Sequence, residues 1–203
     1  MKENIVPIKT RKSLEMRQQE VIDAALRAIG RNGLVRTTLA DIAKEAGIGY
    51  GNLSFRFKKK EALLLAAIQY LIVEYETELD AAAAAGKTAT ERLDNLVAIS
   101  FSKSLTTKNK LAVWAAFWSE GHTQPAYRKL FTRFRLREAE RMTELCRAVL
   151  DERGKAGDAA AAEEIAIGIN ALIDGLWSSM ARGGTLGRED GLRIARNFSK
   201  SIL

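Results

Sequence analysis

Residues 37–64 read TTLADIAKEAGIGYGNLSFRFKKKEALL, and this stretch decides the fold. Thr38 is placed to cap a short helix in a capping box with the acidic residue three positions later. Gly47 can then supply a tight turn, and a second short helix is expected to begin near Gly49 or Tyr50. Two short helices joined by a glycine turn have the spacing of a helix-turn-helix, whose second helix enters the major groove of DNA.

The second helix is predicted to have a buried face and an exposed face. Leu53 and Phe57 are four residues apart and should face the core, and Ile48 should fill the angle between the helices. Three lysines follow at residues 58–60, where their ammonium groups can meet phosphates. The exposed face and the helix start supply the candidate DNA contacts, which are Gly49, Tyr50, Gly51, Asn52, Ser54, Phe55 and Arg56.

The net charge of the chain is concentrated around this motif. Residues 1–60 hold 13 Lys and Arg against 6 Asp and Glu, a net charge of +7, whereas residues 61–203 hold 19 of each. An excess confined to one segment is typical of a surface that binds a polyanion, either nucleic acid or an anionic membrane. Two helices around a glycine turn also occur in proteins that bind neither DNA nor membranes, but the local excess of positive charge favours a DNA-binding protein. The hypothesis of a membrane-surface protein does not explain the spacing of the motif.

The remaining sequence is predicted to be helical, so the fold class is all-α. Apolar residues recur every three or four positions, only two prolines occur, and no strand pattern is present. We expect residues 1–12 to form a basic flexible arm, residues 13–59 a DNA-binding domain of three helices, and residues 60–203 a larger helical domain. The helices of that larger domain are expected at 60–85, 89–105, 108–120, 125–152, 158–182 and 188–202.

The helix-turn-helix segment resembles the N-terminal domain of the TetR repressors. Their pattern runs TT-x-x-x-IA-x-x-AG-V-S-x-G-x-[LI]-Y-x-[YH]-F-x-x-K-x-x-L, and the matching positions are Thr37, Thr38, Ile42, Ala43, Ala46, Gly47, Gly51, Leu53, Phe57, Lys60 and Leu63. The resemblance implies a three-helix DNA-binding head on a helical body that dimerises and encloses an effector. It also implies phosphate contacts from Thr38 and Lys60, with Tyr50, Gly51, Asn52 and Phe55 at or near base edges.

Two departures from this pattern affect the recognition helix. Gly49 stands where the family usually has a serine cap, a change that costs only a few tenths of a kcal/mol. Ser54 and Arg56 replace the usual tyrosine and the aromatic residue or histidine two positions later. Arg56 can then take over the phosphate contact, or it can bind a guanine with two hydrogen bonds, worth about 1–3 kcal/mol of discrimination. Both roles remain open.

A group of aromatic residues in the larger domain suggests an effector site. The stretch WAAFW carries Trp114, Phe117 and Trp118, and Asp174 and Trp177 share one face of a later helix. Indole faces bind quaternary ammonium groups through cation–π contacts, and Asp174 can balance the charge of such a ligand. Large aromatic side chains at helical spacing also fill cores, so packing is the alternative interpretation.

Two segments around these residues are similar to the C-terminal domain of the BetI-type repressors, the branch that controls the conversion of choline to betaine. They are WAAFWSEGHTQPAYRKL at 114–130 and NALIDGLWSSMARGG at 170–184. The resemblance implies a small-molecule effector that releases the repressor from its operator, with choline or a related quaternary ammonium compound as the candidate. An unrelated small molecule is the alternative.

The stretch AEEIAIGINALIDGLWSSMA is apolar on nearly every side, with Gly168, Ala171 and Gly175 forming a strip where another helix can approach closely. It either lies at the centre of its own domain or lines a subunit interface. Family resemblance favours a homodimer through the last two helices, which would read an inverted repeat of double-stranded DNA. The helix at 60–85 joins the head to the body and is therefore expected to transmit an allosteric change between them.

Other function classes find little support. No residues in the sequence form a recognisable acid, base or nucleophile set, so no enzyme, metal site or cofactor is predicted. His122 is the single histidine and is expected in a turn without a second metal ligand. No signal or membrane segment is visible, and the single Cys146 suits a reducing compartment, so we expect a cytoplasmic protein.

Overall fold

The computed structural model describes residues 8–120, 125–155 and 159–203, with side chains from residue 19 onward except at Glu120. All the secondary structure in these ranges is helical. The elements are α1 (Ile8–Asn32), α2 (Leu39–Ala46), α3 (Tyr50–Arg56), α4 (Lys60–Ala85), α5 (Ala89–Ser100), α6 (Lys108–Glu120), α7 (Pro125–Glu152), α8 (Ala159–Ala181) and α9 (Arg188–Ile202). The predicted all-α fold is confirmed.

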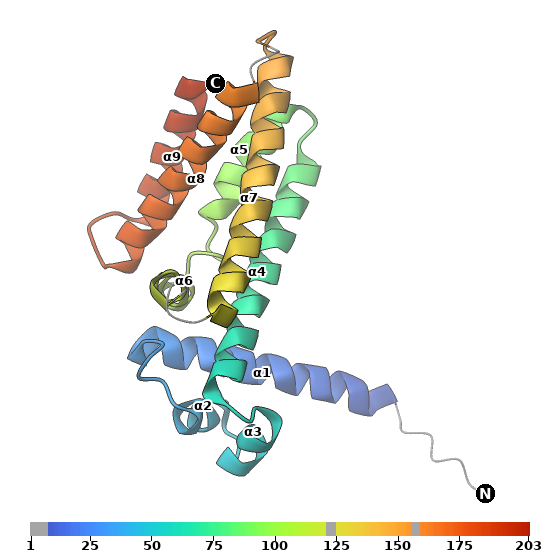
Figure 1. Ribbon diagram of the computed structural model, residues 1–203, viewed down its shortest axis with the longest axis vertical. Coiled ribbons are helices and arrows are strands. Elements are labelled where there is room, and N and C mark those ends of the chain that lie inside the picture. Colours follow the sequence, from blue (N-terminus) through green and yellow to red (C-terminus); the bar gives the residue numbers. More distant parts are fainter. Residues whose placement is uncertain (1–7, 121–124, 156–158) are drawn as a thin grey trace, which may run out of the picture.

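The helices form a small head and a larger body (Figure 1). Helices α1, α2 and α3 make the head, and α4 runs from the head into the body. In the body, α4 packs on α5, α5 and α8 pack on α7, and α9 packs on α8. The short helix α6 lies across the junction, where it contacts α1 of the head as well as α4 and α8 of the body.

Two predicted boundaries differ from the structure. Helix α1 begins at Ile8, so residues 8–12 are helical and do not belong to a flexible arm; the remainder of the predicted arm lies outside the described residues. The residues after Pro7 include no helix breaker, so the helix can begin before residue 13, where the DNA-binding domain was expected to start.

Helix α5 stops at Ser100, five residues earlier than expected. The Ser102 hydroxyl accepts a hydrogen bond from the backbone N–H of Leu105 at 3.3 Å, and the Thr106 hydroxyl donates to the Ser102 carbonyl at 2.6 Å. Such local side-chain bonds compete with the helical hydrogen bonds and end the helix.

The head is held together by a small apolar core. On α1, the residues at helical spacing that are buried are Val21, Ile22, Ala25, Leu26 and Ile29. They pack with Ile42 of α2 and Leu53 of α3, which are 0% and 1% exposed. Each large apolar side chain buried in this way contributes roughly 1.5–3 kcal/mol, so the three helices form a stable platform.

Candidate functional site

The cap of α2 fixes the start of the helix-turn-helix. The backbone N–H of Asp41 donates to the Thr38 hydroxyl at 3.1 Å, and the N–H of Thr38 donates to the Asp41 carboxylate at 2.8 Å. Both bonds of the predicted capping box are present. The bonds from Thr38 hold the pKa of Asp41 below its ordinary value. Thr38 is exposed beside this cap, where a phosphate can approach it.

The turn between the two helices depends on Gly47. Its φ of 65° and ψ of 28° lie in the left-handed region, and its N–H donates to the carbonyls of Ala43 and Lys44. A side chain at this position would be strained, so glycine sets the angle at which α3 leaves α2. Helix α3 then begins at Tyr50 with Gly49 as its cap, which makes no side-chain hydrogen bond.

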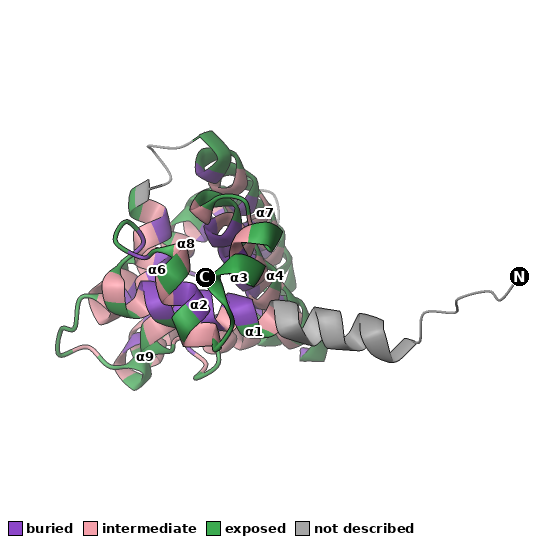
Figure 2. Cartoon of the chain, turned by 90° about the horizontal axis from the view of Figure 1, so that it is seen from below, coloured by how far each residue is buried: buried purple, intermediate pink, exposed green. Residues whose placement is uncertain are grey.

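Helix α3 exposes most of the side chains that the sequence assigned to DNA. Figure 2 looks at the head and shows α3 largely in the exposed colour. Tyr50 is 57% exposed and Phe55 is 89% exposed. Gly51, Asn52 and Arg56 are exposed as well, whereas Ser54 is half-buried and donates to the Gly51 carbonyl at 3.2 Å.

The inner face of α3 differs from the prediction at one residue. Leu53 is buried and Phe57 packs against the core, as expected. Ile48, however, is 36% exposed and does not fill the angle between α2 and α3. Its backbone N–H instead donates to the Ala43 carbonyl at 3.0 Å, which closes the turn. Leu53 takes the central position of the small core.

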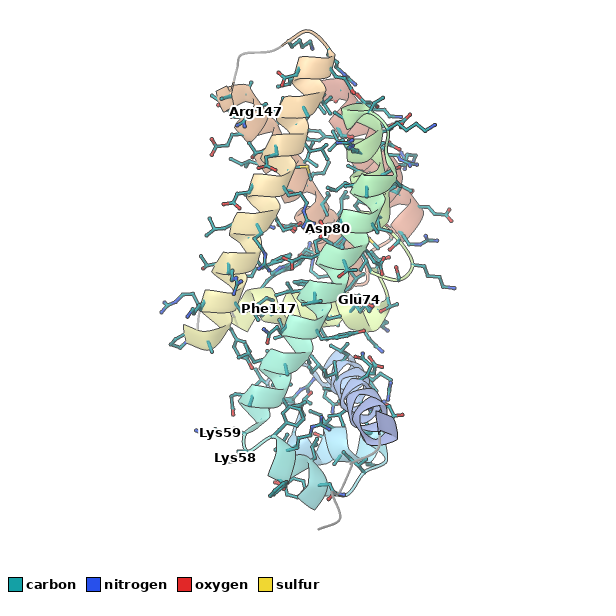
Figure 3. The ribbon with its side chains drawn as sticks, turned by 90° about the vertical axis from the view of Figure 1, so that its right-hand side faces the viewer. Lys58, Lys59, Glu74, Asp80, Phe117 and Arg147 are labelled. Carbon is teal, nitrogen blue, oxygen red and sulfur yellow. The ribbon has the colours of Figure 1, made fainter. Side chains whose placement is uncertain are left out.

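The lysines after α3 lie at the foot of α4. Lys58 and Lys59 are exposed there (Figure 3). Lys60 is half-buried, and its Nζ donates to the Val35 carbonyl at 2.6 Å. An ammonium group has three donors, so this bond positions Lys60 and leaves donors for a phosphate.

Elsewhere in the head, Glu45 pairs with Arg27 and Arg31, and the bonds from Arg31 and Arg27 lower the pKa of its carboxyl.

A second site lies in the body beside α6, where side chains from four helices line a small cavity. The lining residues are Tyr75 from α4, Trp114 and Trp118 from α6, Phe134, Arg135 and Glu138 from α7, and Asn170, Ile173, Asp174 and Trp177 from α8. Trp114 lies in the middle of this aromatic cavity. Its ring centroid is 5.3 Å from that of Phe134, 6.0 Å from Tyr75 and 6.1 Å from Trp177.

The cavity itself is small. Its volume is about 10 Å³, close to the minimum that holds one water molecule. The ring of Trp118 lies 6.4 Å from that of Trp114, and the indole Nε1 of Trp177 donates to the Ser100 carbonyl at 2.9 Å. A ligand larger than water therefore has to separate rings that now touch, with Trp118, half-buried at the edge, the easiest to move.

Four of the five predicted effector residues meet at this cavity, and Phe117 does not. Phe117 is fully buried, and its ring packs against Tyr127 and Phe131 at 6.3 Å and 5.6 Å. It does not line the cavity, and its contacts are those of a packing residue. On α6, Trp114 lies between Phe117 and Trp118 and contacts both rings, whereas Phe117 and Trp118 point about 100° apart around the helix.

The two carboxylates of the cavity have different partners. Asp174 is half-buried and its Oδ2 lies 2.7 Å from Nη1 of Arg135. Burial raises the pKa of Asp174, and Arg135 opposes that rise. Glu138 is 5% exposed, and its Oε1 lies 3.7 Å from the nearest guanidinium nitrogen of Arg141, beyond hydrogen-bonding distance. Burial raises the pKa of Glu138 to about 7.

The sequence left more than half of this cavity unidentified. Six of its ten lining residues were not among the predicted site residues: Tyr75, Phe134, Arg135, Glu138, Asn170 and Ile173. They lie on helices whose apolar pattern matches an ordinary core, and the only sequence signal is the acid at position 138 on the buried face of α7. His122, also considered in the sequence, lies outside the described residues.

Helix α6, which lines the cavity, also contacts the head. The side chain of Asn109 in α6 lies so close to α1 that a Cβ at Gly30 would be 2.7 Å from its Oδ1. Lys110 of α6 pairs with Glu74 of α4 at 2.6 Å. The same helix α6 carries Trp114, so one helix contributes to the cavity and contacts both α1 and α4.

These features define a class of protein. An exposed recognition helix after a capped helix and a glycine turn is a DNA-binding element, and the body behind it contains a separate small aromatic cavity. The chain thus has the architecture of a DNA-binding regulator. Among the described residues, none of the helices combines the length and the apolar character that crossing a membrane requires.

Comparison with known proteins identifies the family. Residues 21–67 match the family of bacterial regulatory proteins of the TetR type, and residues 89–203 match the C-terminal domain of BetI-type transcriptional repressors. The chain is 33% identical over 191 residues to the HTH-type transcriptional regulator BetI of Burkholderia mallei (strain NCTC 10229), covering 93% of this chain and 94% of that protein.

Solved structures share the fold. A transcriptional regulator from Pseudomonas aeruginosa PAO1 superposes with a TM-score of 0.79 at 26% identity, covering 93% of this chain and 90% of that one. A transcriptional regulator from Saccharomonospora viridis, solved in complex with choline, has a TM-score of 0.81 at 24% identity, covering 92% and 96%. The chain belongs to the TetR family of transcriptional repressors and carries a BetI-type C-terminal domain. It is a DNA-binding regulator and not an enzyme.

Proposed function

We propose that the effector of this repressor is a quaternary ammonium compound, with choline the first candidate, and that it binds in the aromatic cavity of the body. The observation that carries the proposal is the meeting of three tryptophan rings and a tyrosine with two carboxylates at one cavity. Ring faces attract a quaternary ammonium group by roughly 0.5–2 kcal/mol each, the greater value when the site is dry. A choline complex of the Saccharomonospora viridis regulator supports this choice.

On this proposal the DNA contacts come from the head. Tyr50, Gly51, Asn52 and Phe55 lie at or near base edges, and Thr38 and Lys60 bind phosphates. Gly49 and Ser54 lie at the start and on the flank of the recognition helix, where the backbone and a hydroxyl can approach the DNA. Arg56 binds either a phosphate or a guanine. The exposure of α3 and its lack of acidic residues support this assignment.

We further infer that the repressor acts as a homodimer through α8 and α9, in the cytoplasm where its operator lies. On the outer side of α8, Ile167 is 58% exposed and Gly175 has open space around it. Half-buried apolar side chains on α9, including Ile194 and Phe198, adjoin this face. Two such faces can pack into a four-helix bundle, which would set two heads against the halves of an inverted repeat.

Effector binding is coupled to release from DNA through the helices that line the cavity. A ligand that enters has to widen a 10 Å³ cavity and so displaces α6 relative to its neighbours. Helix α6 contacts α1, and α4 carries Tyr75 in the body and Lys60 in the head, so both can change the spacing of the two recognition helices. To move the repressor from a 1:99 to a 99:1 ratio of released to DNA-binding conformation, the effector has to bind the released conformation more tightly by about 5.5 kcal/mol.

A tryptophan-fluorescence titration tests the effector proposal. Choline, betaine aldehyde, glycine betaine and the neutral isostere 3,3-dimethylbutan-1-ol are compared on the full chain and on Trp118→Ala. We expect saturable binding of choline, weak or absent binding of the isostere, and loss of choline binding in the variant. Equal binding of the isostere, or no saturable response, would favour an effector of another class and leave the tryptophans as core residues.

A further inference from the structure

We propose that Glu138, rather than Asp174, is the carboxylate that balances the charge of a bound cation in the aromatic cavity, and that binding expels a proton from it. This inference rests on the proposed effector class. It assigns the specificity of the site for a cation to a residue on α7 that the sequence did not reveal.

The first argument is the difference in pairing between the two acids. Asp174 is already neutralised by Arg135 at 2.7 Å, so a cation there would have to compete with a guanidinium. Among the described residues, Glu138 has a looser partner: Arg141 bonds to Asp80 at 2.9 Å, and its Nη1 forms only a long ion pair of 3.7 Å with Glu138, beyond hydrogen-bonding distance. A new cation therefore gains more electrostatic stabilisation from Glu138 than from Asp174.

The second argument is burial. The side chain of Glu138 is 5% exposed and lines the cavity, and its Oε1 is buried without a hydrogen-bond partner. A buried, unpartnered carboxylate oxygen is costly, and a fold keeps few of them without a use. A quaternary ammonium group brings charge but no N–H donor, so it suits this Oε1, which accepts no hydrogen bond from the described residues and belongs to an acid that lines an aromatic cavity.

The third argument concerns the proton. The Tyr75 hydroxyl hydrogen-bonds to Glu138, and the charged groups around this acid are Arg135 and Arg141 on α7, Glu76 on α4 and Asp174 on α8. With a pKa of about 7, Glu138 is largely protonated at pH 6. A cation that arrives at a protonated Glu138 forms a neutral pair with the carboxylate, and the proton leaves to solvent. The tyrosine has its pKa raised well above the ordinary value and stays protonated throughout.

These arguments predict a pH-dependent affinity. Because the proton has to leave before the pair forms, choline affinity should rise about tenfold between pH 6 and pH 8. Choline carries no titratable ammonium proton, so any proton released comes from the protein. About 0.9 protons should be released per bound choline at pH 6 and about 0.1 at pH 8.

Isothermal titration calorimetry measures both quantities, since the dependence of the binding enthalpy on the buffer gives the number of protons released. The wild-type chain and the variants Glu138→Gln, Asp174→Asn and His122→Gln are titrated with choline at both pH values, each time in two buffers that titrate near that pH and differ in ionisation enthalpy. We expect Glu138→Gln to bind choline at least tenfold more weakly at pH 8 and to release no proton. Asp174→Asn and His122→Gln should keep the proton release. A thermal melt of each variant shows that it is folded.

The outcomes separate the two proposals. If wild-type protein binds choline without releasing a proton, or if Glu138→Gln binds it as tightly, the role of Glu138 is overturned while the effector proposal stands. If wild-type protein binds no choline at either pH, the effector proposal is overturned and the role of Glu138 with it.

Discussion

The head and the body of this repressor place their functional side chains in opposite ways. In the head, the residues assigned to DNA are exposed on one short helix, and the core beneath them is made of other residues. In the body, Trp114 and Trp177 line the proposed effector site and are also part of the core, at 4% exposure each. A change in the head can therefore affect function alone, whereas most changes in the cavity affect stability as well.

The largest expected effect is that of Trp114→Ala. Its ring contacts those of five other aromatic residues, so truncation should lower the free energy of unfolding by about 3–5 kcal/mol. Urea denaturation measures this loss. The matched control is Trp118→Ala, whose half-buried ring should cost roughly 1 kcal/mol. Equal losses in the two variants would contradict the central position of Trp114.

The second prediction concerns Glu138 and how its contribution to the stability of the fold changes with pH. The pKa of Glu138 is about 7 in the folded protein against an ordinary 4.5, so the folded state binds the proton more tightly. The contribution of this group to stability is full below about pH 4.5, falls as the pH rises through 7, and is lost above it. Glu138→Gln should therefore be more stable than wild type at pH 8, by up to about 3 kcal/mol, and equal to it near pH 4.5.

Chemical denaturation at pH 8 and pH 4.5 checks the direction of this difference in stability. The exposed neighbour Glu140 gives the control, since Glu140→Gln should show no such difference between the pH values. A Glu138→Gln variant that is less stable at pH 8 would mean that the carboxylate is well compensated in the fold, against the argument from its missing partner.

The third prediction concerns Arg56 in the head. Arg56→Ala should weaken operator binding by about 1–3 kcal/mol and leave stability nearly unchanged, because the side chain is exposed. Fluorescence anisotropy on operators with single base-pair changes distinguishes its two roles. A loss that vanishes when one G·C pair is changed assigns Arg56 to that guanine, and a uniform loss assigns it to phosphate. Arg133→Ala, an exposed arginine on α7, is the control, and equal effects of the two would remove Arg56 from the interface.

The smallest effect is expected for Lys60→Ala. Removing one phosphate contact should flatten the slope of log K against log salt by about 0.9 and weaken all DNA sequences alike. Lys87→Ala removes the same charge beyond the other end of α4 and should leave the slope unchanged. Because Lys60 also bonds to the Val35 carbonyl, a melting curve accompanies the measurement. An unchanged slope would refute the phosphate contact.

The contrast between the two regions also explains what the sequence could predict. The helix-turn-helix follows from local rules, since a cap at Thr38, left-handed Gly47 and a buried Leu53 fall within 16 residues. These features interact only with near neighbours, so spacing alone predicts them. The error at Ile48 concerned packing between two helices, which spacing does not determine.

The cavity was predicted only in part because it is built from four helices far apart in the sequence. Trp114, Trp118, Asp174 and Trp177 were identified from helical spacing, but Tyr75 and Phe134 look like any core aromatic residue. The close pairing of Arg135 with Asp174, which leaves Glu138 with only a looser contact to Arg141, depends on how α7 packs on α8. Only tertiary structure decides such a choice.

The most direct test of the account is release of the operator by choline. Labelled DNA from the region upstream of the gene that encodes this chain is bound by the repressor, and its anisotropy is followed as choline or 3,3-dimethylbutan-1-ol is added. We predict that choline releases the DNA and the neutral isostere does not, and that Trp118→Ala binds the DNA but is not released by choline. Choline that leaves the DNA bound, or that releases Trp118→Ala equally well, would contradict the account.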